Sequence, residues 1–523
     1  MRYAHSERVL LVGVIVAVVG LLAAGIALGS ERARDESIAG AHLHAGHYAH
    51  AGLRFPAALQ PSTTPSQTGF THAGGDIISY LEGGRDAKRV PGTGGRMIYT
   101  GTDAFEPTLG IDKEGNIFYQ GARADQLFFP TLVVSRDGGR SWDDVTPQTH
   151  PHTQDPLVYV DPATGRAFTA DLTYPCITVS HTDDVGQSWT TSQACGLFDH
   201  QNISAGPSVS SSTNGYPNIL YLCATDGGNG TPLSTVTSCL KSLDGGITWV
   251  RTGTPAYTDD PRAGEGHLSI PGHCGGASGH SFVDTKGVLY LPRGWCGQPY
   301  LAISKDEGAT WERIQVADNG MSRGGTTNVC AGVCHNASNY AHEAAVGVDA
   351  KGNIYYFWMG RNRLPYLALS RDGGKSFSNP MMVGPPGLEE AWGPTMEIGA
   401  TGKIALAYVG STNAPGGESP DGVGEEYADA VTWDGYITTS VDALSETPRF
   451  FTASINPSSD PIMRGECDVN RCGVQVDFID VVIGPDGRPY TSMVDGCPPP
   501  GDACAEVIGE GIVGTLIGGP RLR

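Results

Sequence analysis

The chain has 523 residues, 39% of them hydrophobic, so it can bury a large core in several domains or in one repeat array. Glycine is abundant at 73 residues and charged residues make up only 17%, a balance typical of short strands joined by tight turns, and we expect an all-β protein. The formal net charge of −21 argues against a nucleic-acid partner, because phosphate binding requires clustered lysine and arginine.

The N-terminus predicts export. Arg2 and Arg8 precede residues 9–30, a run of 22 residues without a charge. At 1.5 Å per residue, a helix of this length is long enough to cross a bilayer. Residues 1–30 therefore predict either an uncleaved signal anchor, which would be a transmembrane helix, or a cleaved signal peptide. Both place the rest of the chain outside the cytoplasm, membrane-anchored or secreted, with membrane contact through this segment only.

Residues 31–94 predict a flexible tether, because they contain many His, Ser, Thr and Pro residues and few large apolar ones. His42, His44, His47 and His50 lie in this segment, and histidine tracts sometimes hold a metal ion. We favour a solvated linker and expect neither a metal site nor a cofactor.

One turn repeats five times in residues 95–523. It reads Ser or Thr, any residue, Asp, any residue, Gly, two further residues, then Trp or Phe, and its first copy is SRDGGRSW at 135–142. The Asp side chain can accept hydrogen bonds from turn amides, and Gly can adopt a positive φ. The aromatic residue can fill the space between adjacent sheets. We expect a structural role for the five aspartates, which are Asp137, Asp184, Asp244, Asp306 and Asp372.

A second pattern of strand, Gly turn and strand precedes these turns, as in LGIDKEGNIFYQG, and recurs seven times up to FIDVVIGPDGRPYTSM. Each unit then reads as four antiparallel strands with the Asp turn between the third and the fourth. Radial repetition of four-stranded units is typical of a β-propeller. Residues 95–523 therefore predict a propeller of four-stranded antiparallel blades, with seven blades favoured and six as the alternative.

Twelve cysteines support export, since an even number in an exported chain predicts disulfides. We expect neighbours in sequence to pair: Cys176 with Cys195, Cys223 with Cys239, Cys274 with Cys296, Cys330 with Cys334, Cys467 with Cys472, and Cys497 with Cys504. A zinc site at Cys330, Cys334, His335 and His342 is the alternative, although the spacing fits no established zinc pattern.

The five turns resemble the Asp-box, or bacterial neuraminidase repeat, of the sialidase-like β-propellers. The resemblance covers residues 95–523 and implies the propeller architecture. Asp-boxes occur both in propellers that cleave glycans and in propellers that only bind, so the resemblance implies no single activity.

Propeller topology puts the Asp turns on one face, and the loops between second and third strands share the other face with the loops between blades. We expect the functional site on this second face. Sialidases bind the substrate carboxylate with three arginines, a role that the resemblance assigns to Arg293, Arg361 and Arg464. They use a Tyr nucleophile assisted by Glu, which the resemblance assigns to Tyr427 with Glu425 and Glu426.

Two features depart from the sialidase pattern. The early arginine motif of sialidases has only LRFP at 53–56 as a counterpart, inside the expected tether, and we interpret Arg54 as coincidental. The second face also carries His152, His200, His280 and His342 near the starts of successive inner strands. These could ring the channel around a metal or an anion, but we favour ordinary hydrogen-bonded histidines.

Two functions follow from these patterns. The first is an exo-sialidase-type glycoside hydrolase that acts on extracellular glycans. The second is a non-catalytic propeller that binds glycan or protein through the face opposite the Asp turns. A glycan or glycoconjugate is the expected partner in the first case, and the sequence predicts no oligomeric state.

Overall fold

The computed structural model describes residues 68–123, 129–148, 153, 155–173, 175–197, 199–225, 236–258, 278–295, 298–317, 344–360, 362–414, 430–465, 473–475, 477, 479–497, 504 and 509–523. All of them belong to one of two compact units, residues 43–523. The only helical segments in these ranges are the 3-10 turns η2 (Glu82–Gly84) and η4 (Gly473–Gln475). The described part of the chain is therefore all-β, as its composition predicts.

Five sheets each contain four antiparallel strands that are consecutive in sequence. The first three are β5 (Thr108–Ile111) with β6 (Ile117–Arg123), β7 (Phe129–Ser135) and β8 (Asp143–Asp144); β9 (Val158–Val160) with β10 (Ala167–Leu172), β11 (Cys176–Thr182) and β12 (Thr190–Cys195); and β13 (Asn202–Gly206) with β14 (Ile219–Thr225), β15 (Thr237–Ser242) and β16 (Val250–Arg251). The other two are β17 (Phe282–Val283) with β18 (Leu289–Trp295), β19 (Gln298–Ser304) and β20 (Glu312–Gln315); and β21 (Ala345–Val348) with β22 (Ile354–Met359), β23 (Pro365–Ser370) and β24 (Met381–Met382).

Two further sheets contain N-terminal strands. One runs in the order β25 (Glu390–Ile398), β26 (Ile404–Ser411), β27 (Thr432–Ser440), β28 (Arg449–Ser454), β2 (Ile78–Leu81) and β3 (Arg85–Arg89), and β29 (Met463–Arg464) pairs with β27. The other runs in the order β30 (Asp480–Ile483), β31 (Pro489–Asp495), β32 (Gly509–Ile517), β4 (Gly94–Ala104) and β1 (Thr71–Ala73). The sequence favours seven blades over six, and the described strands form seven sheets.

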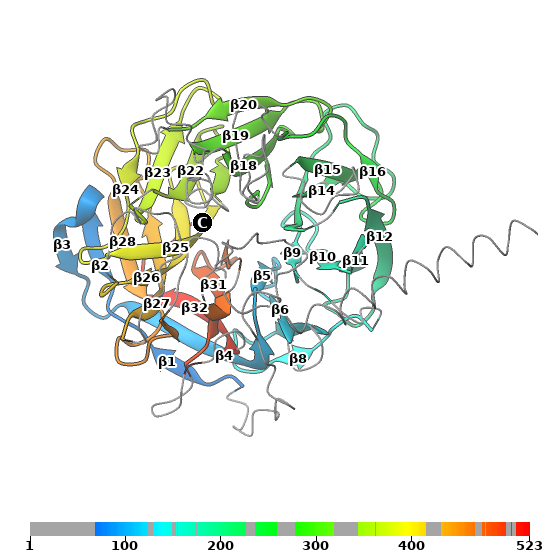
Figure 1. Ribbon diagram of the computed structural model, residues 1–523. Coiled ribbons are helices and arrows are strands. Elements are labelled where there is room, and N and C mark those ends of the chain that lie inside the picture. The colour runs from blue at the N-terminus through cyan, green and yellow to red at the C-terminus, as the bar shows by residue number, and fades with distance from the viewer. Residues whose placement is uncertain are drawn as a thin grey trace, which may run out of the picture. The chain divides into compact units, whose positions relative to one another are not determined.

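The seven sheets are arranged around a common axis (Figure 1). The inner strands are β5, β9, β13, β17, β21, β25 and β30, and most of them contact the inner strand of a neighbouring sheet. Strand β4, from the N-terminal end of the ring, pairs with β32 from its C-terminal end, and the two ends of the ring are joined by this pairing. Radial repetition of antiparallel sheets is the propeller architecture. The predicted β-propeller with four-stranded antiparallel blades is therefore confirmed.

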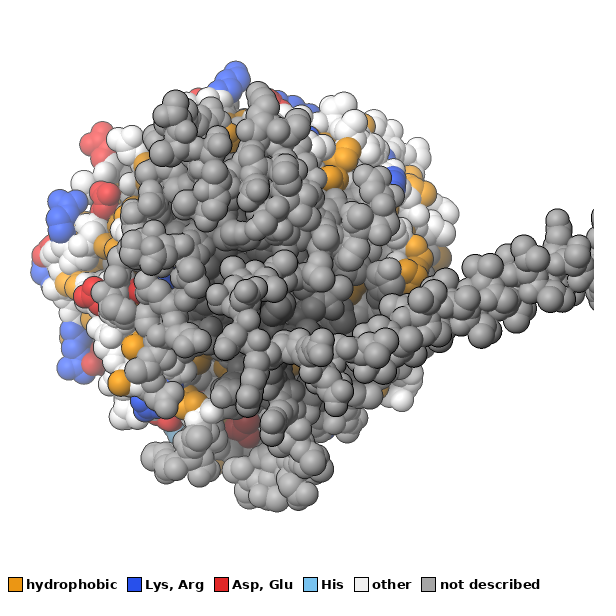
Figure 2. Space-filling view, viewed as in Figure 1, with side chains coloured by type: hydrophobic (Ala, Val, Ile, Leu, Met, Phe, Trp, Pro, Cys, Tyr) orange, Lys and Arg blue, Asp and Glu red, His pale blue; other side chains and the backbone are white. Residues whose placement is uncertain are grey.

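The expected tether differs from the structure in its last part. Residues 71–94 fall within it, yet they form β1, β2 and β3 and the start of β4. All five residues of β3 are exposed and four are charged, which is why the segment resembles a linker in sequence. In Figure 2 basic and acidic side chains mix on the rim where Figure 1 shows β2 and β3, and Lys88 lies 2.9 Å from Asp86. Charged side chains protect an exposed edge strand from pairing with another chain.

The core consists of apolar layers between neighbouring sheets. One layer joins Phe168 and Val179 of the β9–β12 sheet to Ile203 and Leu222 of the β13–β16 sheet, all of them buried. The aromatic residue of the third Asp turn, Trp249, packs against this layer. The aromatic positions of the repeat thus fill the space between sheets, as the pattern predicts.

Three of the predicted disulfides lie in the described residues and are confirmed: Cys176–Cys195, Cys223–Cys239 and Cys497–Cys504. The first two join directly opposite residues of neighbouring strands in one sheet. Each of the other three predicted pairs includes at least one cysteine outside the described residues.

Among the described residues, no helix is long and apolar enough to span a membrane. The predicted signal anchor or signal peptide, residues 1–30, lies outside them.

Candidate functional site

The five Asp turns have the same internal hydrogen bonds. In the third turn the Ser242 hydroxyl and the Thr248 amide donate to Asp244 Oδ1 at 2.8 and 2.9 Å, and the Thr248 hydroxyl donates to Oδ2 at 2.6 Å. The Gly246 amide donates to Ser242 Oγ at 2.8 Å, with Gly246 at a φ of 94°. Equivalent bonds lower the pKa of Asp137, Asp184 and Asp372 to about 2, chiefly through the hydroxyl four residues later. Both carboxylate oxygens are thus used inside the turn.

The opposite face contains the ends where the inner strands begin. Five polar residues lie two or three positions before an inner strand: Glu106 before β5, Asp155 before β9, Asp199 and His200 before β13, and Asp477 before β30. We call these five residues the axial carboxyl cluster. The topology brings them together, because these four inner strands belong to consecutive sheets around the axis.

The axial carboxyl cluster is nearly enclosed, with exposed fractions of 2–6%. The His200 amide donates to Asp155 Oδ2 at 3.0 Å, and His200 Nε2 lies 3.8 Å from Asp477 Oδ2. Glu106, Asp199 and His200 have φ values between 48° and 68°. Non-glycine residues rarely adopt this left-handed conformation, which costs about 1–2 kcal/mol each and is concentrated at functional sites.

Burial raises the pKa of two members of the cluster. The Glu106 pKa lies well above its usual range because of desolvation, and Asp155, Asp477 and Asp199 add like-charge repulsion. The Asp155 pKa is raised well above its usual range by desolvation and by Asp199, while His200 opposes the shift. Glu106 also shares a hydrogen bond with Asp477. Some of these carboxyls therefore keep a proton at a pH where an exposed carboxyl is ionised.

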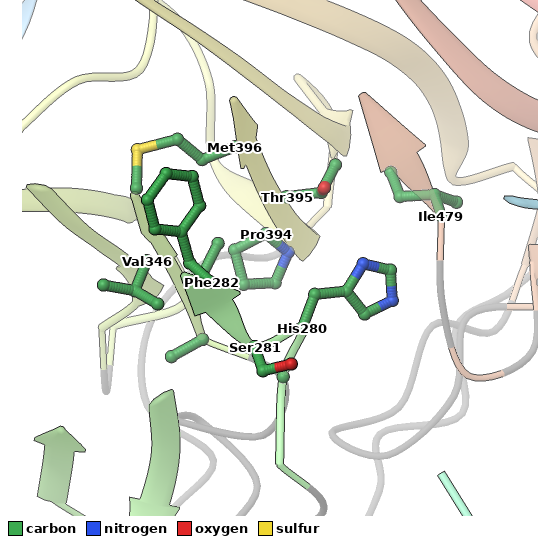
Figure 3. Close-up of a pocket in the computed structure, with 11 residues that line it drawn as sticks. His280, Ser281, Phe282, Val346, Pro394, Thr395, Met396 and Ile479 are labelled. Atoms are coloured by element: carbon green, nitrogen blue, oxygen red, sulfur yellow. The ribbon is translucent and has the colours of Figure 1, made fainter. Parts of the chain in front are cut away.

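A small pocket of about 80 Å³ lies among the inner strands (Figure 3). Its walls come from β17, β21, β25 and β30 and include Phe282, Val346 and Met396. His280 and Ile479 face each other across one end in Figure 3, and His280 Nδ1 lies 3.9 Å from Asp480 Oδ1. Burial raises the pKa of Asp480 to about 7. Ile479 follows Asp477 by two positions, so the Cα atoms of these two residues are at most about 7 Å apart.

The structure describes two of the three predicted carboxylate-binding arginines. Arg293 on β18 is 1% exposed, donates to Thr237 Oγ1 at 2.8 Å, and places its guanidinium 5.4 Å from the centre of the Tyr257 ring. Arg464 is exposed on β29. These two arginines belong to different sheets, and the β21–β24 sheet separates them in the chain. Arg361, Tyr427, Glu425 and Glu426 lie outside the described residues, so their predicted roles stay predictions.

A different arginine of the same face has a carboxylate partner. Arg363, between β22 and β23, lies 2.9 Å from Glu390 at the start of β25, and both side chains are at most 5% exposed. Arg363 has a φ of 60°, and its carbonyl accepts a hydrogen bond from the Ala391 amide at 2.7 Å. This ion pair joins two neighbouring sheets on the face opposite the Asp turns.

Glu106, Asp199 and Asp477 were not among the residues that sequence patterns singled out, whereas Asp155 lies in the same loop as the predicted channel residue His152, three positions after it. Their signal is positional, since each precedes an inner strand by two or three residues. Of the predicted channel histidines, His200 belongs to the cluster and His280 to the pocket, while His152 and His342 lie outside the described residues. Within the described ranges, no group of three or more His, Cys, Asp or Glu side chains is arranged to hold a metal ion.

No protein-family profile and no curated protein matches this chain. Solved structures do match it, and three of them are described here. A protein of unknown function from Dyadobacter fermentans is 14% identical, with a TM-score of 0.37, over 83% of this chain and 100% of that one. The Penicillium chrysogenum α-L-arabinanase complexed with arabinobiose is 12% identical, with a TM-score of 0.36, over 74% and 98%. The intramolecular trans-sialidase of Ruminococcus gnavus, complexed with oseltamivir carboxylate, is 12% identical, with a TM-score of 0.36, over 75% and 90%. Likenesses this distant carry no argument about activity.

Proposed function

We propose that this protein is an exported propeller that acts on extracellular glycans as a glycoside hydrolase, with its site on the face where the inner strands begin. The observation that carries this proposal is the axial carboxyl cluster. Glycoside hydrolysis uses one carboxyl that is still protonated near neutral pH and a second that is ionised. The raised pKa of Glu106 suits it to protonate the leaving oxygen, with an ionised neighbour as base or nucleophile. Three disulfides support export, and we take each of the seven sheets as one blade.

The sialidase-type version of this proposal assigns the nucleophile to Tyr427 with Glu425 and Glu426, and the carboxylate clamp to Arg293, Arg361 and Arg464. It is supported by the resemblance of the five Asp turns. In that version Tyr427→Phe abolishes most of the turnover of a sialoside, because the hydroxyl acts only as the anomeric bond breaks.

A panel of fluorogenic glycosides, one sialoside among them, tests the proposal with the purified protein. We expect hydrolysis of at least one glycoside, and a kcat lowered about 100-fold or more in Glu106→Gln, the usual loss for a general acid. Asp434→Asn is the matched control. Asp434 is a largely buried carboxyl on β27 whose pKa burial raises to about 6, but it contacts Asn456 and not the axial carboxyl cluster. Equal losses in both variants would point to a general effect of removing buried carboxyls.

The alternative is a non-catalytic glycan- or protein-binding propeller that uses the same face. The enclosure of the axial carboxyl cluster favours it, because the reacting bond of a bulky substrate must reach side chains that are 2–6% exposed. Retention of glycans on an array, together with an absence of hydrolysis across the panel, is the result that selects this alternative.

A further inference from the structure

The pocket among the inner strands has mainly apolar walls. Phe282, Val346 and Met396 form much of its wall, from β17, β21 and β25 (Figure 3). His280 and Ile479 line it as well, and each precedes an inner strand by one or two positions, so the pocket lies on the face where the inner strands begin. The His280 side chain is 37% exposed, and Phe282 and Met396 are partly exposed. Solvent therefore reaches the walls of this pocket.

The polar side chains of the wall have contacts with residues that do not line the pocket. The Ser281 hydroxyl lies 2.7 Å from the Ser204 hydroxyl. The Thr395 hydroxyl donates to Asp480 Oδ1 at 3.4 Å, and His280 Nδ1 lies 3.9 Å from the same oxygen. A group that enters the pocket therefore meets mainly carbon. A polar group there would give up its hydrogen bonds with water for few in return, which is unfavourable.

The volume of the pocket limits the size of the group that it can hold. A dry apolar cavity of about 150 Å³ accommodates benzene, which has six carbon atoms. A pocket of about 80 Å³ therefore has room for about three carbon atoms. A whole sugar ring is too large, whereas a methyl group with the ring carbon that carries it fits. An acetamido group is similar in size, but its N–H and carbonyl both require hydrogen-bond partners.

We propose that the glycan taken by this face carries a 6-deoxy sugar, whose C6 methyl group occupies the pocket against Phe282, Val346 and Met396. An ordinary hexose has a hydroxymethyl group at this position, and its hydroxyl would be buried among apolar side chains. The loop that contributes Ile479 also contributes Asp477 to the axial carboxyl cluster, which places the methyl site and the carboxyls on one face. This inference rests on the proposed action on glycans and names the class of sugar.

Ligand-observed NMR titration of the intact protein with two pairs of methyl glycosides tests the inference. The pairs are the L-rhamnoside with the L-mannoside and the L-fucoside with the L-galactoside, and the members of each pair differ only by the hydroxyl at C6. We expect the 6-deoxy member of at least one pair to bind about tenfold or more tighter than its partner, as an apolar pocket discriminates against an added hydroxyl. The methyl glycoside of N-acetylglucosamine should bind more weakly than the preferred 6-deoxy sugar.

The Val346→Thr variant should reduce the preference for the 6-deoxy sugar to about threefold or less, because a hydroxyl in the wall can pair with the hydroxyl at C6. Val348→Thr is the matched control, since Val348 is a buried residue of the same strand that does not line the pocket, and it should keep the preference. The wild-type comparison decides the question even if Val346→Thr does not fold.

Equal or tighter binding of the hydroxylated member in both pairs overturns the inference. A preference for the N-acetylglucosamine glycoside, or no binding of any of these sugars, overturns it as well. In each of these cases hydrolysis within the fluorogenic panel, or retention of glycans on an array, leaves the action on glycans or the binding alternative standing. An absence of both, together with no binding of these sugars, overturns the proposed function together with the inference.

Discussion

In the third Asp turn, one carboxylate accepts four hydrogen bonds, one of them from the Ile247 amide at 3.2 Å. Asp244 accepts hydrogen bonds from Ser242 and from both the amide and the hydroxyl of Thr248, and these bonds lower its pKa against the opposing effect of desolvation. The turn has a positive φ at Gly245 and Gly246, so the backbone alone does not fix it. The hydrogen bonds of the Asp244 side chain therefore fix the conformation of the turn.

Asp244→Ala should lower the free energy of unfolding by about 1–3 kcal/mol, because it leaves the turn amides and hydroxyls without their acceptor. Chemical denaturation measures the change, and glycan binding by the molecules that fold should stay as in the wild type. Asp143→Ala is the control, since Asp143 is an exposed residue of β8 in a surface ion pair with Arg136; it should cost about 0.5 kcal/mol or less. Normal stability with lost binding in Asp244→Ala would contradict the separation of the two faces.

At the scale of elements, the fourth Asp turn also joins two sheets. Glu307 occupies a position that is Gly in three of the other turns, and its carboxylate accepts hydrogen bonds from the amides of Val209, Ser210 and Ser211 at 2.7–3.0 Å. Lys241 of β15 donates to its other oxygen at 2.9 Å. The turn between β19 and β20 is thereby attached to the loop between β13 and β14 of the neighbouring sheet.

Glu307→Gln should lower the free energy of unfolding by about 1–3 kcal/mol, because the amide cannot accept bonds at both positions and leaves Lys241 without its ion pair. Thermal unfolding followed by circular dichroism checks this expectation. Glu312→Gln, which alters an exposed carboxylate 3.7 Å from Lys305, should leave the transition unchanged. An identical small shift in both variants would mean that Glu307 does not connect the sheets.

The strands that the sequence predicts best are those that lead into an Asp turn, because that turn has a fixed residue pattern. The turn between β27 and β28 does not match the sequence pattern of the Asp turns and was not predicted. Its Ser440 hydroxyl nevertheless donates to Asp442 Oδ1 at 3.0 Å, as in the other turns. It lacks the glycine and the aromatic residue, which have been replaced by Leu444 and Thr447. Strand β3 was also missed, because an edge strand with an exposed, charged surface looks like a linker in sequence.

The candidate site was harder to predict than the fold for a physical reason. The axial carboxyl cluster draws Glu106, Asp155, Asp199 and Asp477 from four different loops, so no local spacing marks it. For Arg293 the position was predictable and the environment was not. The topology predicts that it lies on the face opposite the Asp turns, but its packing on the Tyr257 ring depends on side-chain contacts between strands. Topology predicts which face a residue is on, and packing decides whether it is available there.

At the scale of the whole molecule, two groups of carboxyls oppose each other in their response to pH. Burial raises the pKa of Glu397, Asp480 and Asp495 to about 7. Between pH 4 and 7 the folded protein therefore holds more protons at these groups than the unfolded chain does. The Asp-turn carboxylates, with pKa values lowered to about 2, hold fewer protons than the unfolded chain when the pH falls below 4.

The free energy of unfolding should therefore be greatest near pH 4–5. As the pH rises toward 8 it should fall, by about 1.4 kcal/mol per pH unit for each carboxyl that is protonated in the folded protein and ionised in the unfolded chain. It should fall again as the pH drops toward 2. Urea denaturation at pH 3, 5 and 8 measures both slopes, and Asp495→Asn should flatten the decline above pH 5. A protein that grows steadily more stable from pH 5 to pH 8 would show that the buried carboxyls are ionised without penalty.

The pairing of β4 with β32 also sets the order in which the molecule can be completed. About 400 residues separate the two strands, so at a synthesis rate of about 5–20 residues per second β4 waits about 20–80 seconds for its partner. During that interval Met97 and Tyr99, both buried in the finished ring, lack their packing against Ile512 and Leu516 of β32. The ring of the nascent chain therefore cannot close until β32 has been synthesised. Delayed closure fits the proposed export, in which the chain would cross the membrane unfolded and the ring would be joined on the far side.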